Sequence, residues 1–154
     1  MKGIRTSAKA IIIEDGKILL TRNEDAQGAF YLLPGGGQRH GEPLSEAVVR
    51  ECMEETGVLV SVGDLLLVRD YISDNHEFAE QDDDVHQVEF MFRCRIVDGD
   101  AHSGETPDIW QTGVEWVKVS KLRDVRLYPA ALVEPLQRIA RGERPAICYL
   151  GDVN

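Results

Sequence analysis

The sequence predicts an α/β protein in which a mixed β-sheet lies between helices, an α/β/α sandwich. Apolar runs rich in β-branched residues occur before, between and after two segments with helical periodicity. The chain has 154 residues, of which 43% are hydrophobic, which is enough for one buried core. No repeat, linker or low-complexity tract divides it. We therefore expect a single domain over residues 1–154.

The first part of the chain predicts a hairpin. Residues 4–13 and 17–22 are apolar runs joined through Asp15-Gly16, and Asp-Gly between such runs is a strong turn signal. Residues 23–29 are polar and predict a loop, and residues 30–33 predict an extended segment leading into a proline.

A loop followed by a helix comes next. Gly35 to Gly37 follow Pro34, and such a glycine run predicts a loop whose backbone approaches another group closely. Pro43 suits a first helical turn and Gly57 suits a helix stop. We therefore predict a helix over residues 43–56.

The middle of the chain predicts further strands. Residues 58–62 and 65–72 are apolar runs with a turn or bulge between them, whereas residues 73–84 are mostly acidic and predict an exposed loop. Residues 88–96 alternate, which predicts a strand with one face in the core. The residues predicted to face that core are Val88, Phe90, Phe92, Cys94 and Ile96.

The last third predicts a loop over residues 98–108, a strand over residues 114–119 and a helix over residues 128–141. Pro135 lies inside this helix and predicts a kink or a later start. The final residues, 153–154, are expected to fray.

The first predicted helix changes character along its length. At about 100° per residue, Glu51, Glu54 and Glu55 lie on the same side as the apolar Leu44 and Val48. Carboxylates at these spacings repel one another, and burial adds a desolvation cost. The pattern therefore predicts a cation beside the three glutamates.

The nature of the donors indicates which cation. Carboxylate oxygens without clustered His or Cys suit Mg²⁺, with Mn²⁺ as the next candidate, and disfavour zinc. The alternative is that the three glutamates form a solvated helix face beside Arg50, as most acidic runs do. The preceding glycine loop favours the metal site.

The spacing of these residues resembles the complete motif of the Nudix hydrolase family. The motif is glycine, five residues, glutamate, seven residues, Arg-Glu, an apolar residue, any residue, Glu-Glu, any residue, glycine and an apolar residue. It is matched by Gly36, Glu42, Arg50, Glu51, Cys52, Glu54, Glu55, Gly57 and Val58. More loosely, the flanks resemble the family at residues 33–36 and 115–117.

The resemblance implies the same sandwich fold and hydrolysis of a nucleoside diphosphate linked to another group. It implies that Glu51, Glu54 and Glu55 are catalytic and bind Mg²⁺, with the Gly36 carbonyl as a further ligand. It also implies that Arg50, together with Glu42, supports the catalytic loop and helix.

Substrate contacts are less well marked. By resemblance, Arg22 lies near the substrate, and Arg39 in the motif loop is a similar candidate; an exposed arginine is the alternative for both. Tyr71, Phe78 and Trp110 are candidates for stacking on a nucleobase, with core or rim packing as the alternative. The family's markers for ADP-ribose and for dinucleoside polyphosphates are not at their expected places.

The general base is also open. Some relatives carry a catalytic glutamate in a region that corresponds to Trp110 and Gln111, where this chain has no acid. The remaining candidates are Glu51, Glu105, Asp108, Glu77 and Glu80.

Three functions are compatible with the sequence. The first is a magnesium-dependent hydrolase that cleaves the pyrophosphate linkage of a nucleotide or nucleotide-sugar substrate. The second is a catalytically silent nucleotide-binding regulatory module, and the third is an isomerase on the same motif. Because every motif carboxylate is present, the first is favoured.

Net charge and cysteine content restrict the expected partners and the expected cellular compartment. The net charge of −10 disfavours binding to a nucleic acid polymer, although a small phosphoanhydride substrate remains compatible. The three cysteines, Cys52, Cys94 and Cys148, fit reduced thiols. No apolar run predicts a signal peptide or a membrane span, so we expect a cytoplasmic protein. A homodimer is compatible with the resemblance.

Overall fold

The larger of two β-sheets forms the centre of the molecule. The computed structural model describes residues 2–77, 79, 80 and 84–154. The strand order is β5 (Gly35–Gly37), β1 (Arg5–Ile11), β7 (His86–Asp98), β6 (Leu59–Ile72) and β9 (Tyr149–Asp152). Two neighbouring pairs, β1 with β7 and β6 with β9, are parallel and the other two are antiparallel. The predicted mixed sheet is therefore confirmed.

The smaller sheet is antiparallel. It contains β2 (Ile13–Glu14), β3 (Lys17–Asp25), β4 (Gly28–Leu32) and β8 (Gln111–Lys118), with β3 between β4 and β8. Asp15 and Gly16 turn the chain between β2 and β3 with φ of 50° and 73°. The predicted hairpin is present, but β3 extends through Asp25 into residues expected to form a loop.

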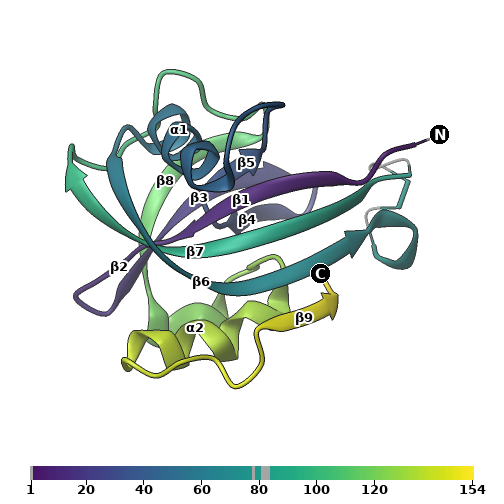
Figure 1. Cartoon of the computed structure of the whole chain (residues 1–154). Coiled ribbons are helices and arrows are strands. Elements are labelled where there is room, and N and C mark those ends of the chain that lie inside the picture. The colour runs from purple at the N-terminus through teal and green to yellow at the C-terminus, as the bar shows by residue number, and fades with distance from the viewer. Residues whose placement is uncertain (1, 78, 81–83) are drawn as a thin grey trace.

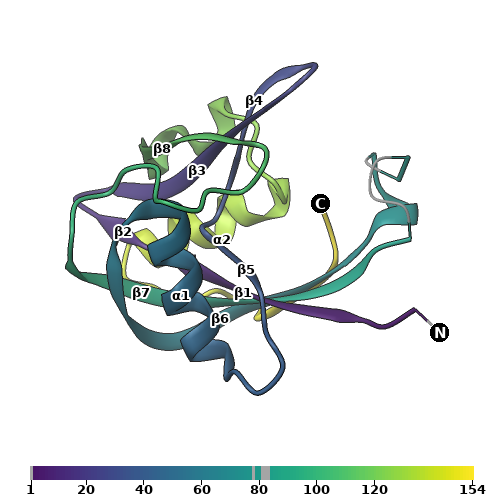
Figure 2. The same ribbon diagram turned by 90° about the horizontal axis from the view of Figure 1, so that it is seen from above.

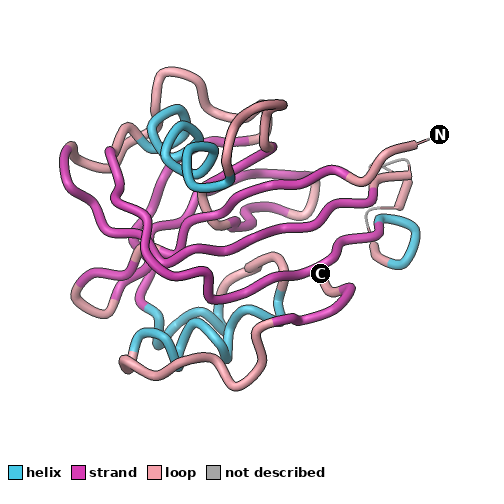
Figure 3. Tube along the Cα trace, in the orientation of Figure 1, coloured by secondary structure: helices cyan, strands magenta, loops and turns pink. Residues whose placement is uncertain are grey.

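The helices lie on opposite sides of the strands. In Figure 1, α1 (Leu44–Thr56) lies above the larger sheet and α2 (Val133–Ala140) lies below it. Figure 3 shows the strands as the layer between them, and Figure 2 shows α1 from above, across the sheet. Short 3-10 turns complete the fold: η1 (Ser73–Asn75), η2 (Val119–Asp124) and η3 (Ala130–Leu132). This arrangement is the predicted α/β/α sandwich.

Both ends of α1 follow the sequence signals. Pro43 is the N-cap residue, and Gly57 ends the helix with φ of 71° while its N–H donates to the Met53 carbonyl at 3.1 Å. The loop after β7 then returns to this end of the helix. Its backbone N–H groups at His102, Gly104 and Thr106 donate to the carbonyls of Thr56, Glu55 and Glu54. The last turn of α1 is thereby satisfied by a distant segment.

One predicted loop is a strand because of a tertiary contact, and two other elements follow predicted alternatives. Gly35 to Gly37 form strand β5 instead of a loop, since they pair with the edge of β1. Residues 59–72 form one strand with irregular register between Val62 and Leu67, which confirms the predicted bulge. The last helix starts late, at Val133, with Pro135 in its first turn, as one of the two alternatives predicted.

The end of the chain differs from the prediction. The sequence analysis missed β9, which pairs with β6, and fraying of residues 153–154 is wrong. The Val153 carbonyl and the Asn154 side chain accept hydrogen bonds from Arg69 Nη1 at 2.5 and 3.3 Å. An ordered arginine therefore holds this segment in place.

The prediction that β7 buries only one face is wrong. Cys94 is buried as expected, but Met91 is fully buried and Glu89 is only 5% exposed on the opposite face. The reason is that the larger sheet is covered on both sides. One core lies under α1 and includes Ala8, Ala10, Ile12, Ala47, Val48, Cys52 and Cys94. The other lies toward α2 and includes Ile11, Leu67, Met91, Leu122, Leu132, Leu136 and Ile139.

The three cysteines are free thiols in the structure. Cys52 and Cys94 are buried thiols, Cys148 is exposed, and none forms a disulfide. Burial raises the pKa of Cys94 to about 12, which keeps this thiol protonated and unreactive. Within the described residues, neither helix has the length and apolarity needed to cross a membrane.

Candidate active site

The motif glutamates meet the glycine strand β5. Glu55 Oε2 accepts a hydrogen bond from the Gly35 backbone N–H at 2.9 Å. A Cβ atom on Gly36 would lie 2.7 Å from the Glu51 carboxylate. Glycine at position 36 is therefore required for this carboxylate to lie directly against the backbone of β5.

Arg50 joins the loop to the helix through several charge-assisted bonds. Its Nε and Nη2 donate to the two Glu42 oxygens at 2.8 and 2.9 Å, and Nη2 also donates to the Gly37 carbonyl at 2.9 Å. Its Nη1 lies 2.8 Å from Glu51 Oε1 and 3.3 Å from Glu54 Oε2. Arg50 thus fixes the loop and orients two of the three glutamates.

Glu55 is the most buried of the three carboxylates, at 7% exposure. Burial raises its pKa to about 7, opposed by the positive charge of Lys9 and the Gly35 N–H, while the negative charges of Glu51 and Asp108 raise it further. Buried negative charge at this point is therefore only partly compensated by the protein.

The donor set fits the hard cation expected from the sequence. Carboxylate oxygens of Glu51 and Glu55 and the backbone of Gly36 converge on one edge, and oxygen donors are those that Mg²⁺ prefers. Among the residues that the structure describes, no three His, Cys, Asp or Glu side chains are grouped closely enough to hold a metal ion as they stand. Glu51 and Glu54 instead share Arg50, so metal binding would require their side chains to turn.

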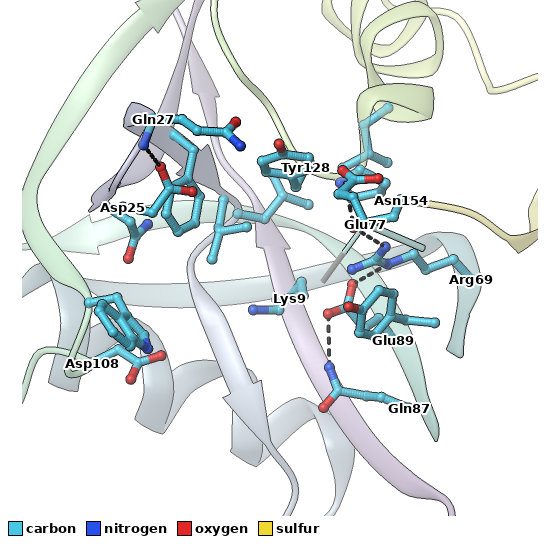
Figure 4. A pocket seen from close by; sticks show the side chains of 18 of the residues that line it. Lys9, Asp25, Gln27, Arg69, Glu77, Gln87, Glu89, Asp108, Tyr128 and Asn154 are labelled. Atoms are coloured by element: carbon cyan, nitrogen blue, oxygen red, sulfur yellow. Dashed lines mark hydrogen bonds and ion pairs between the residues drawn. The ribbon is translucent and has the colours of Figure 1, made fainter. Parts of the chain in front are cut away.

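A large cavity lies beside this edge, toward the second core. Its volume is about 620 Å³, which is in the range of small-molecule sites. Figure 4 shows Lys9 in the middle of the cavity, with Asp108 on one side and the Arg69–Glu89 pair on the other. Polar lining residues include Lys9, Asn23, Arg69, Gln87, Glu89 and Asp108.

The floor of the cavity carries a buried ion pair between β6 and β7. Arg69 and Glu89 are directly opposite in register, and Arg69 Nε donates to Glu89 Oε2 at 2.7 Å. Gln87 Nε2 donates to Glu89 Oε1 at 2.9 Å. Each oxygen of this buried carboxylate therefore has a donor, as burial requires.

Aromatic rings form another wall. Phe30 and Tyr128 meet edge to face with centroids 5.8 Å apart. The Arg126 guanidinium lies over both rings, at 5.4 and 5.5 Å, and binds Asp25 through Nη2 at 2.6 Å. The wall is thus held rigid by a cation that joins β3, β4 and the segment before η3.

Comparison with known proteins identifies the family of this chain. The sequence model of the NUDIX domain matches residues 3–138. The chain belongs to the Nudix family. The match covers most of both sheets and both helices, so the Nudix fold and the Nudix motif occur together in this chain.

This chain spans only part of the length of the curated relatives that it matches. An ADP-ribose pyrophosphatase of Methanocaldococcus jannaschii is 36% identical over 97 residues, which are 62% of this chain and 53% of that protein. Putative nudix hydrolase 1 of Caenorhabditis elegans is 31% identical over 122 residues, 75% of this chain and 29% of that protein. Nucleoside triphosphatase NudI of Salmonella agona is 30% identical over 95 residues, covering 58% and 67%.

Solved structures confirm the fold. A NUDIX hydrolase from Nitrosomonas europaea superposes with a TM-score of 0.73 at 21% identity, covering 100% of this chain and 81% of that one. A MutT NUDIX hydrolase from Burkholderia pseudomallei superposes with a TM-score of 0.70 at 25% identity, covering 90% and 99%.

The residues predicted to contact the substrate lie in different parts of the structure. Tyr71 lines the cavity. Arg22 does not; its Nη1 binds Thr112 Oγ1 at 2.8 Å and Glu24 at 2.8 Å. Arg39 is largely exposed, and its Nη2 lies 3.7 Å from Glu54. Only Tyr71 is therefore positioned at the cavity, and Arg39 lies at the motif loop.

The other candidates are also separated by the fold. Trp110 lines the cavity mouth and is 64% exposed, whereas Phe78 lies outside the described residues. Of the loop acids proposed as general base, Asp108 and Glu77 line the cavity. Glu105 and Glu80 are exposed and do not.

Several cavity residues were missed by sequence analysis. The sequence does contain a signal for them, because charged residues interrupt the apolar alternation of three strands: Lys9 in β1, Arg69 in β6 and Glu89 in β7. Buried charge within such strands marks function or a pair. Asn23 lines the cavity, whereas its neighbour Arg22, the residue predicted to contact the substrate, does not.

Glu42 allows the motif loop to be tested by pH. Hydrogen bonds from the Arg50 guanidinium and from the Arg39 backbone N–H lower the Glu42 pKa from 4.5 to about 2, although the partial burial of Glu42 acts in the opposite direction. Because the folded-state pKa is depressed, this stabilisation is complete above about pH 4.5 and is lost as the pH falls through 2. We expect Glu42→Gln to lower the Tm at neutral pH, with a difference from wild type that shrinks on acidification. Thermal unfolding of both proteins from pH 7 to 2.5 measures this; a pH-independent difference contradicts it.

Proposed function

We propose that this Nudix chain is a magnesium-dependent pyrophosphohydrolase that cleaves the pyrophosphate linkage of a nucleoside diphosphate derivative. The observation that carries the proposal is the position of the motif carboxylates beside a cavity with aromatic and cationic lining. Glu51 and Glu55 lie against strand β5, and Glu54 shares Arg50 with Glu51. A phosphoanhydride with an attached nucleoside has these two requirements: charge stabilisation at one end and an apolar site at the other.

The proposed ligands of Mg²⁺, or of Mn²⁺, are the Gly36 carbonyl and the carboxylates of Glu51, Glu54 and Glu55. When bound, the metal would screen the phosphate charge and lower the pKa of a water molecule. Arg50 fixes the loop through Glu42 and holds Glu51 and Glu54 close to it; on metal binding, these two carboxylates would turn from Arg50 Nη1 toward the ion.

The remaining residues bind the substrate and move the proton. Phe30, Tyr128 and Trp110 offer aromatic surface for a nucleobase. Tyr71 remains a predicted substrate contact as a cavity-lining residue, but it is 6% exposed and its ring already stacks on His76 with 5.5 Å between the ring centroids. Asp108 is our candidate for the general base, because it lines the cavity and its charge acts on Glu55. Arg22 and Arg39 remain predicted contacts for parts of a substrate outside the cavity. We further propose a cytoplasmic location, a small-molecule partner without nucleic acid polymer or membrane, and a homodimer as the assembly to test.

A panel of compounds tests the proposal. Purified protein is incubated with ADP-ribose, nucleotide sugars, dinucleoside polyphosphates and nucleoside triphosphates, with Mg²⁺ or with chelator, and the products are separated. We expect one class to release a nucleoside monophosphate or inorganic phosphate only with Mg²⁺. The relatives favour ADP-ribose and nucleoside triphosphates as the first compounds to try, by what their names say of those proteins.

The alternative is a silent nucleotide-binding module. Binding of one compound without turnover, with Mg²⁺ or Mn²⁺ present, would contradict hydrolysis and support this alternative. Rearrangement of a substrate without release of phosphate would instead indicate an isomerase.

A further inference from the structure

Lys9 occupies a core-facing position in the middle of the larger sheet. In β1, Ala8 and Ala10 are buried under α1, whereas Ile11 is buried on the opposite side. Lys9 shares the side of Ile11 by the two-residue period of a strand. An apolar residue would be expected there, yet the chain places an ammonium group that lines the cavity.

The ammonium group of Lys9 makes few polar contacts within the described part of the protein. Its Nζ donates to the Gly35 carbonyl at 3.2 Å. Among the described residues, that is its one side-chain hydrogen bond, and no carboxylate lies within ion-pair distance of it. A lysine has three donors, so two remain for a ligand. Figure 4 shows the group in the open middle of the cavity, between Asp108 and Glu89.

The other cation lining the cavity is already paired. Arg69 donates to the buried Glu89 at 2.7 Å and to the Val153 carbonyl. Within the described part of the lining, Lys9 is therefore the cation without an ion pair. Such a half-buried charge favours an anion in the cavity.

Lys9 also lies next to the motif glutamates. The Gly35 peptide unit carries Glu55 on its N–H, at 2.9 Å, and Lys9 on its carbonyl, at 3.2 Å. The Lys9 side chain fills the space beside Gly35, since a Cβ on that glycine would lie 2.8 Å from Lys9 Cδ. An anion bound by Lys9 would thus lie on the cavity side of β5, one peptide away from the motif edge.

We propose that Lys9 binds a phosphate group of the substrate on the cavity side of Gly35. This inference rests on the proposed function for the identity of the anion, and it fixes the direction of the substrate. The phosphate chain then passes Gly35 with one end at the motif glutamates, and the nucleoside lies beyond Lys9 against the aromatic wall.

The competing interpretation is structural. In this interpretation Lys9 only holds the Gly35 carbonyl and offsets the negative charge of Glu55 and Glu89. Its positive charge opposes the rise of the Glu55 pKa and contributes to the lowered Glu89 pKa. A structural role predicts a loss of stability with no specific loss of anion binding. The test must therefore measure binding and folding separately.

Inorganic pyrophosphate is a suitable probe because it carries no base and needs no turnover. Its binding is measured by calorimetry with chelator present, for wild type, Lys9→Met, Lys9→Arg and the control Lys121→Met. Lys121 is exposed and lies outside the cavity. We expect Lys9→Met to weaken binding by about 10- to 100-fold, the range for a lost charge-assisted hydrogen bond. Lys9→Arg should recover most of the affinity, and Lys121→Met should bind as wild type does.

Thermal unfolding without ligand checks that each variant is folded, and Lys9→Gln is a second neutral variant if Lys9→Met is not. Equal affinity of wild type and the neutral variants, or equal loss in Lys121→Met, overturns the inference. The result is separable from the proposed function. A wild type that hydrolyses nothing but loses pyrophosphate binding with Lys9 supports the anion site alone; a wild type that hydrolyses normally, with unchanged binding in Lys9→Met, refutes the anion site alone.

Discussion

Glu51→Gln is expected to lower kcat by roughly 10²- to 10³-fold, the range for loss of one group that stabilises developing charge. Glu51 is the carboxylate that lies against Gly36 and is bound by Arg50 Nη1 at 2.8 Å. The change keeps the side-chain shape but removes the negative charge that a metal ligand needs. Steady-state kinetics at saturating Mg²⁺, on the substrate found with the panel, measure the effect.

Gly36→Ala separates the position of this carboxylate from its charge. The new Cβ would lie 2.7 Å from the Glu51 carboxylate, so the flexible end of Glu51 must move while the backbone does not. We expect a loss of activity close to that of Glu51→Gln with little change in Tm. Gly37→Ala is the matched control, because its Cβ would meet only Arg5 Nη2, at 3.5 Å.

Glu46→Gln is the corresponding control on α1, since Glu46 is exposed in the first turn. Activity of Gly36→Ala equal to that of Gly37→Ala would contradict the placement of Glu51 in the catalytic site. A large loss in Glu46→Gln would show that general helix charge, and not this carboxylate, controls the rate.

Arg69→Met is expected to destabilise the protein by about 3–5 kcal/mol, because it leaves a buried carboxylate without its cation. Glu89 is 5% exposed, and among the described residues Gln87 would be its remaining side-chain donor. The Val153 carbonyl would lose its donor as well. Denaturant unfolding at neutral pH measures the change, with Arg95→Met as a control at an exposed position farther along β7.

The effect should depend on pH. In the wild type, burial works to raise the Glu89 pKa, but attraction to Arg69 and Lys9 and hydrogen bonds from Arg69 and Gln87 bring it below its usual value. A depressed folded-state pKa stabilises above the unfolded pKa, and this stabilisation is lost as the pH falls through the folded value. The difference between wild type and Arg69→Met should therefore shrink at acidic pH.

A double variant identifies the cause. Replacing both members of a buried pair by apolar residues is often close to neutral, so Arg69→Met with Glu89→Leu should regain most of the lost stability. If the double variant is as unstable as Arg69→Met, the loss arises from packing or from the Val153 contact, and the ion-pair explanation is wrong.

The motif illustrates what sequence analysis can predict. Pro43 and Gly57 defined the first helix to within one residue, because helix starts and stops depend on local backbone chemistry. The spacing of Glu51, Glu54 and Glu55 placed them on one side of that helix for the same reason. Strand β5 was predicted as a loop, since its pairing with β1 depends on residues far away in the chain.

The substrate predictions illustrate the limit. Arg22 and Asn23 are neighbours in β3, and which of them faces the cavity depends on the orientation of the strand in its sheet. Periodicity assigned β7 a single buried face, but Glu89 and Met91 are buried on the other. A one-residue error in facing reverses the role of every side chain in a strand.

By itself, the sequence determined the helix that carries the carboxylates and the family, because both are read from residues close together in the chain. The order of apolar runs and helical segments, together with the family resemblance, indicated the α/β/α class. Only the tertiary structure decided the cavity, since β1, β6 and β7 bring Lys9, Arg69 and Glu89 together from positions up to 80 residues apart. The physical reason is that pairing between distant strands, and cover on both sheet faces, set which charged side chains are buried and must find a partner or a ligand.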